Sequence, residues 1–214
     1  MRISHGWFGM NKYIFLFFLA AQVATGQTWV LRIAALGSVY GNPLSVSPLN
    51  SNIIYGAPGG RQVYISRNRG YNWQVFGNAV PAFDLGSNVI KSIAVSPLDT
   101  LQLVVGVESN GGSPDRIYKT VDGGQTWTQT WGGTFYLYGE PVEFKPAHPD
   151  TIYTQGNDTL WRSTNFGSTW DTVRRTTGLF NSWCDAEIRP DSANIMYVGD
   201  ASSGIWKTTD YGVH

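Results

Sequence analysis

Short alternations of apolar and polar residues recur along the chain, and each of them ends at a proline. The prolines are Pro48, Pro97, Pro146 and Pro190, and the apolar stretches NIIYG, LQLVVG, DTIYT and NIMYVG follow them in turn. An alternation with a period of two predicts half-buried strands, while proline and glycine mark the turns between strands. The pattern therefore predicts four units of short strands and a fold that is all-β.

Each unit also contains a motif with a hydroxyl residue, an acid or amide, a glycine and a tryptophan. TVDGGQTW at 120–127 returns as SRNRGYNW at 66–73, STNFGSTW at 163–170 and, in shorter form, TTDYGVH at 208–214. The acid or amide falls at Asn68, Asp122, Asn165 and Asp210, so the period is 43 to 54 residues. Such periods indicate repeated structural units, and a unit of four strands is one blade of a β-propeller.

The motif has the composition of a turn. An acid or amide oxygen can accept backbone N–H groups, glycine can adopt positive φ, and tryptophan can cover a hairpin. We interpret the motif as the turn between the third and fourth strands, because four copies of a catalytic site around one ring would make little chemical sense. The residues assigned to this structural role are Ser66, Asn68, Gly70, Trp73, Thr120, Asp122, Gly124, Thr126, Trp127, Ser163, Asn165, Gly167, Thr169, Trp170, Thr208, Asp210 and Gly212.

These residues resemble the Asp-box, or BNR, repeat, and the resemblance covers nearly all of the chain after residue 26. It implies a β-propeller similar to those of sortilin-type receptors, xyloglucan-cleaving glycoside hydrolases and a photosystem II assembly factor. The expected blades span approximately 42–76, 89–131, 140–173 and 184–214, with the last one incomplete. The resemblance also implies that the motif is a structural turn, remote from the ligand face.

The stretch GQTW occurs at 26–29 as well as at 124–127, so residues 27–31 are expected to form a closing fourth strand. The sequence ends inside the fourth motif. Two interpretations stay open: residues 27–31 complete the last blade of a four-bladed ring, or the chain is an incomplete fragment of a larger ring. We prefer the second, because proteins with this repeat resemble the larger rings.

The N-terminus is typical of an export signal. Lys12 precedes an apolar run from Tyr13 to Ala21, and small residues precede a cleavage site after residue 26. Residues 1–26 are therefore predicted to be a signal peptide, with Met10 as an alternative start. Because the apolar run is too short to cross a bilayer, we expect no membrane span after signal removal and a secreted or periplasmic location.

Charge and composition exclude several classes of partner and site. The chain has 15 basic and 15 acidic side chains, so its net charge of zero argues against a nucleic-acid partner. A single cysteine, Cys184, excludes an intrachain disulfide and is expected to be a packed thiol. No metal-ligand spacing and no phosphate-binding loop occurs, so no cofactor is predicted.

The connections opposite the motif differ most in length, and long loops are where repeat proteins place binding residues. The two long stretches are GNAVPAFDLGS at 77–87 and ESNGGSPDR at 108–116. The ligand-face candidates in them are Phe83, Asp84, Glu108, Asp115 and Arg116. The alternative is that these residues belong to solvated loops without a function.

Other acids allow an enzymatic hypothesis. Glu143 and Glu187 precede Lys145 and Arg189 by two residues, so they fit a charge ladder between blades or a pair of carboxylates for glycoside hydrolysis. The aromatic residues near Trp131 could stack on sugar rings or pack in the core. We interpret the protein as a binding scaffold for a protein or polysaccharide, and the alternative is a glycoside hydrolase of the xyloglucanase type.

Overall fold

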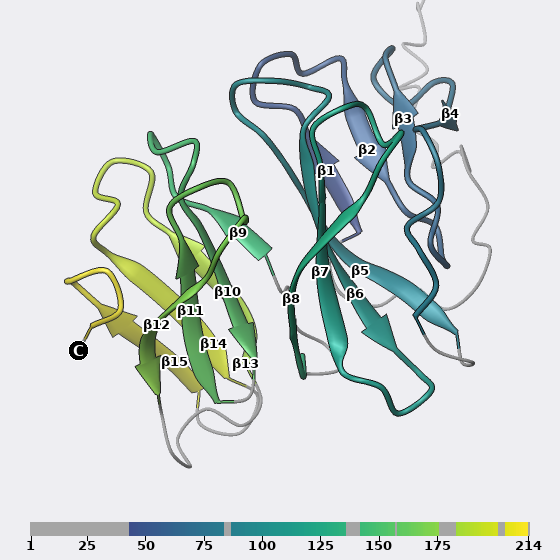
Figure 1. Cartoon of the computed structure of the whole chain (residues 1–214). Helices are drawn as coiled ribbons and strands as arrows, with labels where there is room; N and C mark the ends of the chain where they lie inside the picture. Colours follow the sequence, from purple (N-terminus) through teal and green to yellow (C-terminus); the bar gives the residue numbers. More distant parts are fainter. Residues whose placement is uncertain are drawn as a thin grey trace, which may run out of the picture. The chain divides into compact units, whose positions relative to one another are not determined.

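The computed structural model describes residues 43–83, 87–135, 142–156, 158–175, 183–200 and 204–213, and its regular structure in these ranges consists of strands (Figure 1). The strands are β1 (Leu44–Val46), β2 (Ile54–Gly56), β3 (Tyr64–Ser66), β4 (Gln74–Val75), β5 (Asn88–Val95), β6 (Leu103–Ser109), β7 (Asp115–Thr120), β8 (Thr128–Gly133), β9 (Val142–Phe144), β10 (Ile152–Gly156), β11 (Thr159–Ser163), β12 (Asp171–Arg175), β13 (Trp183–Ile188), β14 (Met196–Asp200) and β15 (Gly204–Thr208). The predicted signal peptide, the predicted strand 27–31 and the candidate Asp84 lie outside the described residues.

The strands form four antiparallel sheets in which neighbours along the chain are hydrogen-bonded neighbours in space. The orders are β1-β2-β3-β4, β5-β6-β7-β8, β9-β10-β11-β12 and β13-β14-β15. A four-stranded meander of this kind is the blade of a β-propeller. The prediction of an all-β fold built from four-stranded units is confirmed, and the last sheet contains three strands within the described residues.

Apolar clusters join each sheet to the next one. Tyr55 and Ile65 of the first sheet pack with Ile93, Val105 and Tyr118 of the second. A second cluster joins the second and third sheets, and a third cluster joins the third and fourth. Because strands alternate their side chains between two faces, each central sheet contributes to two clusters. In the second sheet β5 is buried throughout and β6 is buried from residue 103 to residue 108, so the prediction of half-buried strands is wrong for these two strands, which pack against a neighbouring sheet on each face.

The residue seven positions after each repeated proline shows how this burial depends on a neighbouring sheet. Tyr55, Val104 and Tyr153 are buried in the first, second and third clusters respectively. The equivalent Tyr197 in the last sheet is 39% exposed, and Ile205 on the same face is 83% exposed. Tyr197 therefore has the same position along its strand as the other three residues, but it is not buried as they are.

The repeated motif lies between the third and fourth strand of each sheet, and after the third strand of the last one. In the second sheet, Thr120 Oγ1 donates to Asp122 Oδ1 at 2.8 Å and accepts from the Gly124 N–H at 2.9 Å. Asp122 also accepts from the N–H and the hydroxyl of Thr126, at 2.9 and 2.6 Å. The first two bonds recur in the other three turns, from Ser66, Ser163 and Thr208.

Two consecutive positions of each turn have positive φ. The motif glycines do so, with φ values of 83°, 79°, 68° and 85° at Gly70, Gly124, Gly167 and Gly212. The preceding position does so as well, although it holds Arg69, Phe166 or Tyr211 in three of the four turns. Non-glycine residues rarely adopt this conformation, so the side-chain hydrogen bonds of the motif are needed to hold it.

The hydrogen bonds of Asp122 predict a specific dependence of stability on pH. Bonds from Thr126 and Thr120 lower the pKa of Asp122 from 3.8 to about 2. A carboxyl group whose pKa is lower in the folded state stabilises the fold above its unfolded pKa, and this contribution disappears as the pH falls towards the folded pKa. Asp122→Asn copies Asn68 and Asn165 of the other turns. We expect this variant to show a smaller slope of the unfolding free energy against pH in the window between the two pKa values, 3.8 and about 2. Urea titrations at pH values across the window measure the slope, and an unchanged slope in the variant would contradict this role of Asp122.

Candidate functional site

Four of the five predicted ligand-face residues lie in the structure at one end of the second sheet. Asn88 pairs with Ser109, and Asp115 pairs with Gly133, at this end, while Thr120 and the motif lie at the other. Glu108 and Asp115 are not in solvated loops, because β6 extends to Ser109 and β7 begins at Asp115. The expectation of a long exposed loop over 108–116 is therefore corrected to a short connection between two long strands.

Glu108 and Asp115 are buried next to a lysine that the sequence analysis missed. Lys91 of β5 is fully buried, and its Nζ lies 3.3 Å from Glu108 Oε1. Lys91 occurs where the register between β5 and β6 shifts, between Ile90 and Ser92. The only sequence signal for it is one charged residue inside the apolar run NVIKSIAV.

Asp115 connects two segments of backbone. Its Oδ1 accepts the Ser109 N–H at 2.8 Å, and its Oδ2 accepts the Phe135 N–H at 2.6 Å. Burial raises the pKa of Asp115, although these two bonds oppose the shift, and burial lowers the pKa of Lys91 against the attraction of Glu108 and Asp115. Both carboxylates are thus engaged with partners inside the protein.

Phe83 and Arg116 form a separate contact. The Arg116 guanidinium lies 4.2 Å from the centre of the Phe83 ring, and its Nη1 donates to Gln129 Oε1 at 2.9 Å. Phe83 also packs beside Tyr118, which belongs to the cluster between the first and second sheets. Because Arg116 is adjacent to Asp115 in a strand, the two side chains point to opposite faces of the sheet. The predicted candidates therefore divide into two groups instead of forming one site.

The other predicted chemical groups also have structural partners. Trp131 stacks on Phe135 with 5.1 Å between ring centres, and both are buried, so packing is the observed role of this pair. Arg189 forms an ion pair with Asp191 at 2.6 Å, and the Lys145 ammonium lies 4.2 Å from the centre of the Tyr211 ring. Within the described ranges, no group of three or more His, Cys, Asp or Glu residues could hold a metal ion.

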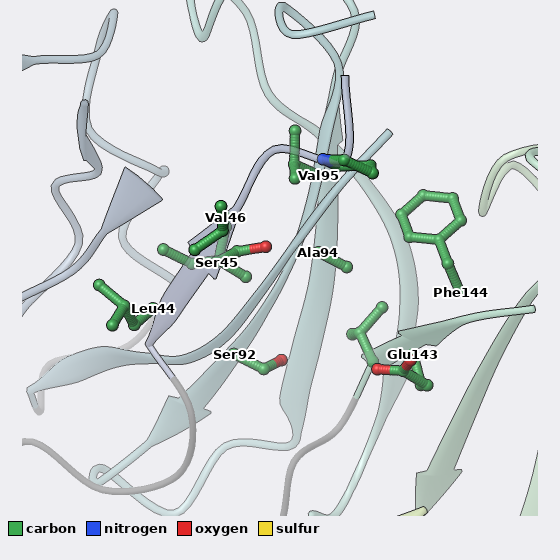
Figure 2. Close-up of a pocket in the computed structure, with 11 residues that line it drawn as sticks. Leu44, Ser45, Val46, Ser92, Ala94, Val95, Glu143 and Phe144 are labelled. Carbon is green, nitrogen blue, oxygen red and sulfur yellow. The ribbon is translucent and has the colours of Figure 1, made fainter. Parts of the chain in front are cut away.

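A groove of about 230 Å³ is formed by the first strands of three sheets (Figure 2). Its residues are Leu44, Ser45, Val46 and Pro48 from β1 and its turn, Ser92, Ile93, Ala94 and Val95 from β5, and Val142, Glu143 and Phe144 from β9. These segments are about 50 residues apart in the sequence, one repeat period, and meet because equivalent strands of successive sheets lie side by side. No candidate from the sequence lines this groove except Glu143.

The groove combines exposed apolar side chains with three polar ones, Ser45, Ser92 and Glu143. Leu44 and Val46 are 53% and 51% exposed, which is unusual for aliphatic residues at alternate positions of a strand. Ser92 is 2% exposed, and its Oγ has no hydrogen-bond partner among the described residues. In Figure 2 this hydroxyl is directed towards the side of the groove where Glu143 lies. A buried hydroxyl without a partner is costly, so a ligand that binds it would gain stability.

No protein-family model and no curated protein sequence matches this chain. Among solved structures, it is similar to the GH74 xyloglucanase from Xanthomonas campestris, with 16% identity over 82% of this chain and 30% of that one and a TM-score of 0.64. It is also similar to the Niastella koreensis GH74 enzyme, with 20% identity, 86% and 30% coverage and a TM-score of 0.56. A third match is YCF48 bound to D1 peptide, with 14% identity, 82% and 55% coverage and a TM-score of 0.50.

These proteins are β-propellers, and the likeness shows the fold. The chain spans about 30% of the length of the first two structures that it matches. At identities of 20% or less, residue roles in those proteins do not transfer to this chain. No helix among the described residues is long and apolar enough to cross a membrane.

Proposed function

We propose that this protein is a binding scaffold whose ligand occupies the groove between β1, β5 and β9. The observation that carries the proposal is the groove itself, where exposed Leu44 and Val46 stand beside a buried Ser92 hydroxyl that has no hydrogen-bond partner in the described residues. Apolar walls with a small number of polar groups are typical of ligand sites. The partner is a protein or a polysaccharide.

The acids at the end of the second sheet favour binding over hydrolysis. A glycoside hydrolase needs one carboxyl group to protonate the leaving oxygen and a second to act as nucleophile or base. Asp115 already accepts two backbone N–H groups, and Glu108 pairs with Lys91 in a buried position. The carboxyl groups of these two acids are therefore already bound to partners inside the protein, which opposes a role as acid, base or nucleophile on a substrate.

The similar solved structures include proteins of both kinds. Two are GH74 enzymes, one of them named as a xyloglucanase, and YCF48 was solved with a D1 peptide bound. The scaffold proposal includes the assignment of the repeated turns to the Asp-box type and export by residues 1–26. N-terminal sequencing of the protein recovered from the producing cells and their medium tests the export step, since cleavage after residue 26 should expose Gln27 as the first residue.

A pair of matched valine substitutions tests the groove. Val46 and Val121 have nearly equal exposure, at 51% and 56%, but only Val46 lines the groove. We expect ligands selected from an array of glycans and short peptides to bind Val46→Lys about tenfold more weakly than the wild type, because the substitution replaces an apolar contact by a longer, charged side chain that extends into the groove; a tenfold change corresponds to about 1.4 kcal/mol. Val121→Lys should bind as the wild type does, and thermal melting should show that both variants are folded.

Reducing-sugar release from a panel of β-glucans distinguishes the enzymatic alternative. A binding scaffold releases no sugar, so there is no turnover that the replacement of a single acid by its amide could abolish. If the protein releases sugar, and Glu143→Gln or Glu187→Gln abolishes the release while the melting temperature is unchanged, the hydrolase hypothesis replaces the scaffold.

A further inference from the structure

The walls of the groove are sheet edges. Each of β1, β5 and β9 is the first strand of its sheet and pairs with one strand, respectively β2, β6 and β10, within the described part of the chain. An edge strand directs alternate N–H and C=O groups away from its sheet. Of these edges, β1 and β9 are partly exposed, whereas β5 is buried along its whole length, so an extended polypeptide would pair with β1 or β9.

The side chains of the groove define what such a polypeptide would carry. Leu44 and Val46 lie at alternate positions of β1, and Phe144 lies on the opposite wall, so apolar side chains at alternate ligand positions would be buried against them. Phe144 is the one aromatic residue among the described residues that line the groove, so aromatic stacking of a glycan there would be limited to one sugar ring. Shape and apolar character thus favour a peptide over a glycan.

The charge of the groove gives a further constraint. Glu143 is its one charged lining residue in the described part of the chain, and it is half-buried on β9. A carboxylate beside apolar walls attracts a cation more strongly than one in open water, because the local dielectric constant is lower. The same environment repels an acidic ligand, so Glu143 can discriminate between ligands as well as bind them.

We infer that the groove binds an extended peptide segment in which apolar residues flank a lysine or an arginine, with the cation beside Glu143 and a polar group of the peptide on Ser92. This inference rests on the proposed scaffold function and narrows its partner to a basic, apolar polypeptide segment. Ser92 Oγ can both donate and accept, so a peptide N–H or C=O can satisfy it.

The test uses the full chain and a set of short acetylated synthetic peptides, in which leucine and valine flank one variable position that is Lys, Arg, Gln or Glu. Fluorescence anisotropy measures the affinity of each peptide. We expect the Lys and Arg peptides to bind about tenfold more tightly than the Glu peptide, and the difference to shrink as salt is added, since exposed charges are screened. Glu143→Lys should invert the preference.

A matched control exists in the fourth sheet. Glu187 pairs with Tyr197 as Glu143 pairs with Tyr153, but Glu187 is exposed and does not line the groove. Glu187→Lys should keep the preference of the wild type. Ser92→Ala should lower the affinity for all of the peptides by a similar factor of about three to ten, as expected for the loss of one hydrogen bond.

The outcomes separate this inference from the scaffold proposal. If no peptide binds, or the preference for Lys and Arg survives Glu143→Lys, the inference is wrong. A parallel titration with xyloglucan oligosaccharides then decides the rest: binding that Val46→Lys weakens would keep the scaffold and make its ligand a glycan. An absence of binding by peptides and glycans alike would overturn both.

Discussion

Lys91→Met is expected to destabilise the fold by about 3–5 kcal/mol, the range for removing one partner of a buried ion pair. The ammonium is fully buried 3.3 Å from Glu108 Oε1, and the buried Asp115 lies close enough to contribute to the same electrostatic balance. Methionine fills a similar volume, so the loss comes from two carboxylates that stay in a buried environment without their cation. Urea unfolding followed by tryptophan fluorescence measures the effect.

A double substitution separates charge from packing. Lys91→Met combined with Glu108→Leu removes both members of the pair, and we expect it to recover a large part of the stability lost in Lys91→Met, because apolar pairs replace buried ion pairs at little cost. If the double variant is as unstable as the sum of the two single variants, the pair does not act as a unit and the interpretation fails.

The Lys91→Met variant should also gain stability, relative to the wild type, as the pH is lowered. Burial raises the pKa of Asp115, and loss of the cation should raise it further. A carboxyl group with a raised folded pKa is most favourable to the fold when protonated, and this contribution is lost as the pH rises through the folded pKa. The stability difference between the wild type and the variant should therefore be smaller in acid than at neutral pH.

Gly77→Ala is expected to cost about 2–5 kcal/mol, the sum of a positive-φ penalty and of overpacking against rigid backbone. Gly77 has a φ of 61°, and a Cβ atom there would lie 2.4 Å from the carbonyl carbon and oxygen of Gly124. The contact joins the end of the first sheet to the motif of the second. Asn78 donates to the carbonyls of Gly124 and Gln125, and Trp127 donates to the Asn78 carbonyl.

Gly112→Ala is the matched control for this substitution. Gly112 also has positive φ, at 84°, but a Cβ atom there would meet nothing within 4 Å. Both variants carry the backbone penalty, of about 1–2 kcal/mol, and only Gly77→Ala forces the two sheets apart. Thermal unfolding of the two variants should differ clearly, and equal melting temperatures would show that the contact between residue 77 and the second motif does not limit stability.

The sequence alone predicted the features whose interactions are local. The strand alternation, the proline and glycine turns and the period of the motif follow from residues that are close together in the chain. The side-chain hydrogen bonds that Thr120 and Asp122 form within the turn span at most four residues, as between Asp122 and Thr126, so a pattern of eight residues contains both partners of each of them. The all-β fold with four-stranded units could be read from these features for that reason.

The candidate site was less predictable, because it depends on the face to which each strand residue points. Loop length indicated Glu108, Asp115, Phe83 and Arg116 together, but the structure divides them between two faces of one sheet. It also adds Lys91, which the register shift in β5 brings to Glu108. A bulge changes the alternation of side chains from that point onward, and a single sequence does not reveal where it occurs.

The sequence by itself thus determined the strands, the repeated turns and the class of fold, since short-range hydrogen bonds and the period of apolar residues are fixed by neighbouring positions. Only the tertiary structure decided which residues meet across sheets. Leu44, Ser92 and Glu143 line one groove because three sheets pack side by side, although the chain separates these residues by about one repeat each. Burial of Lys91 and exposure of Tyr197 have the same origin, because the environment of a strand residue depends on the sheet that packs against it.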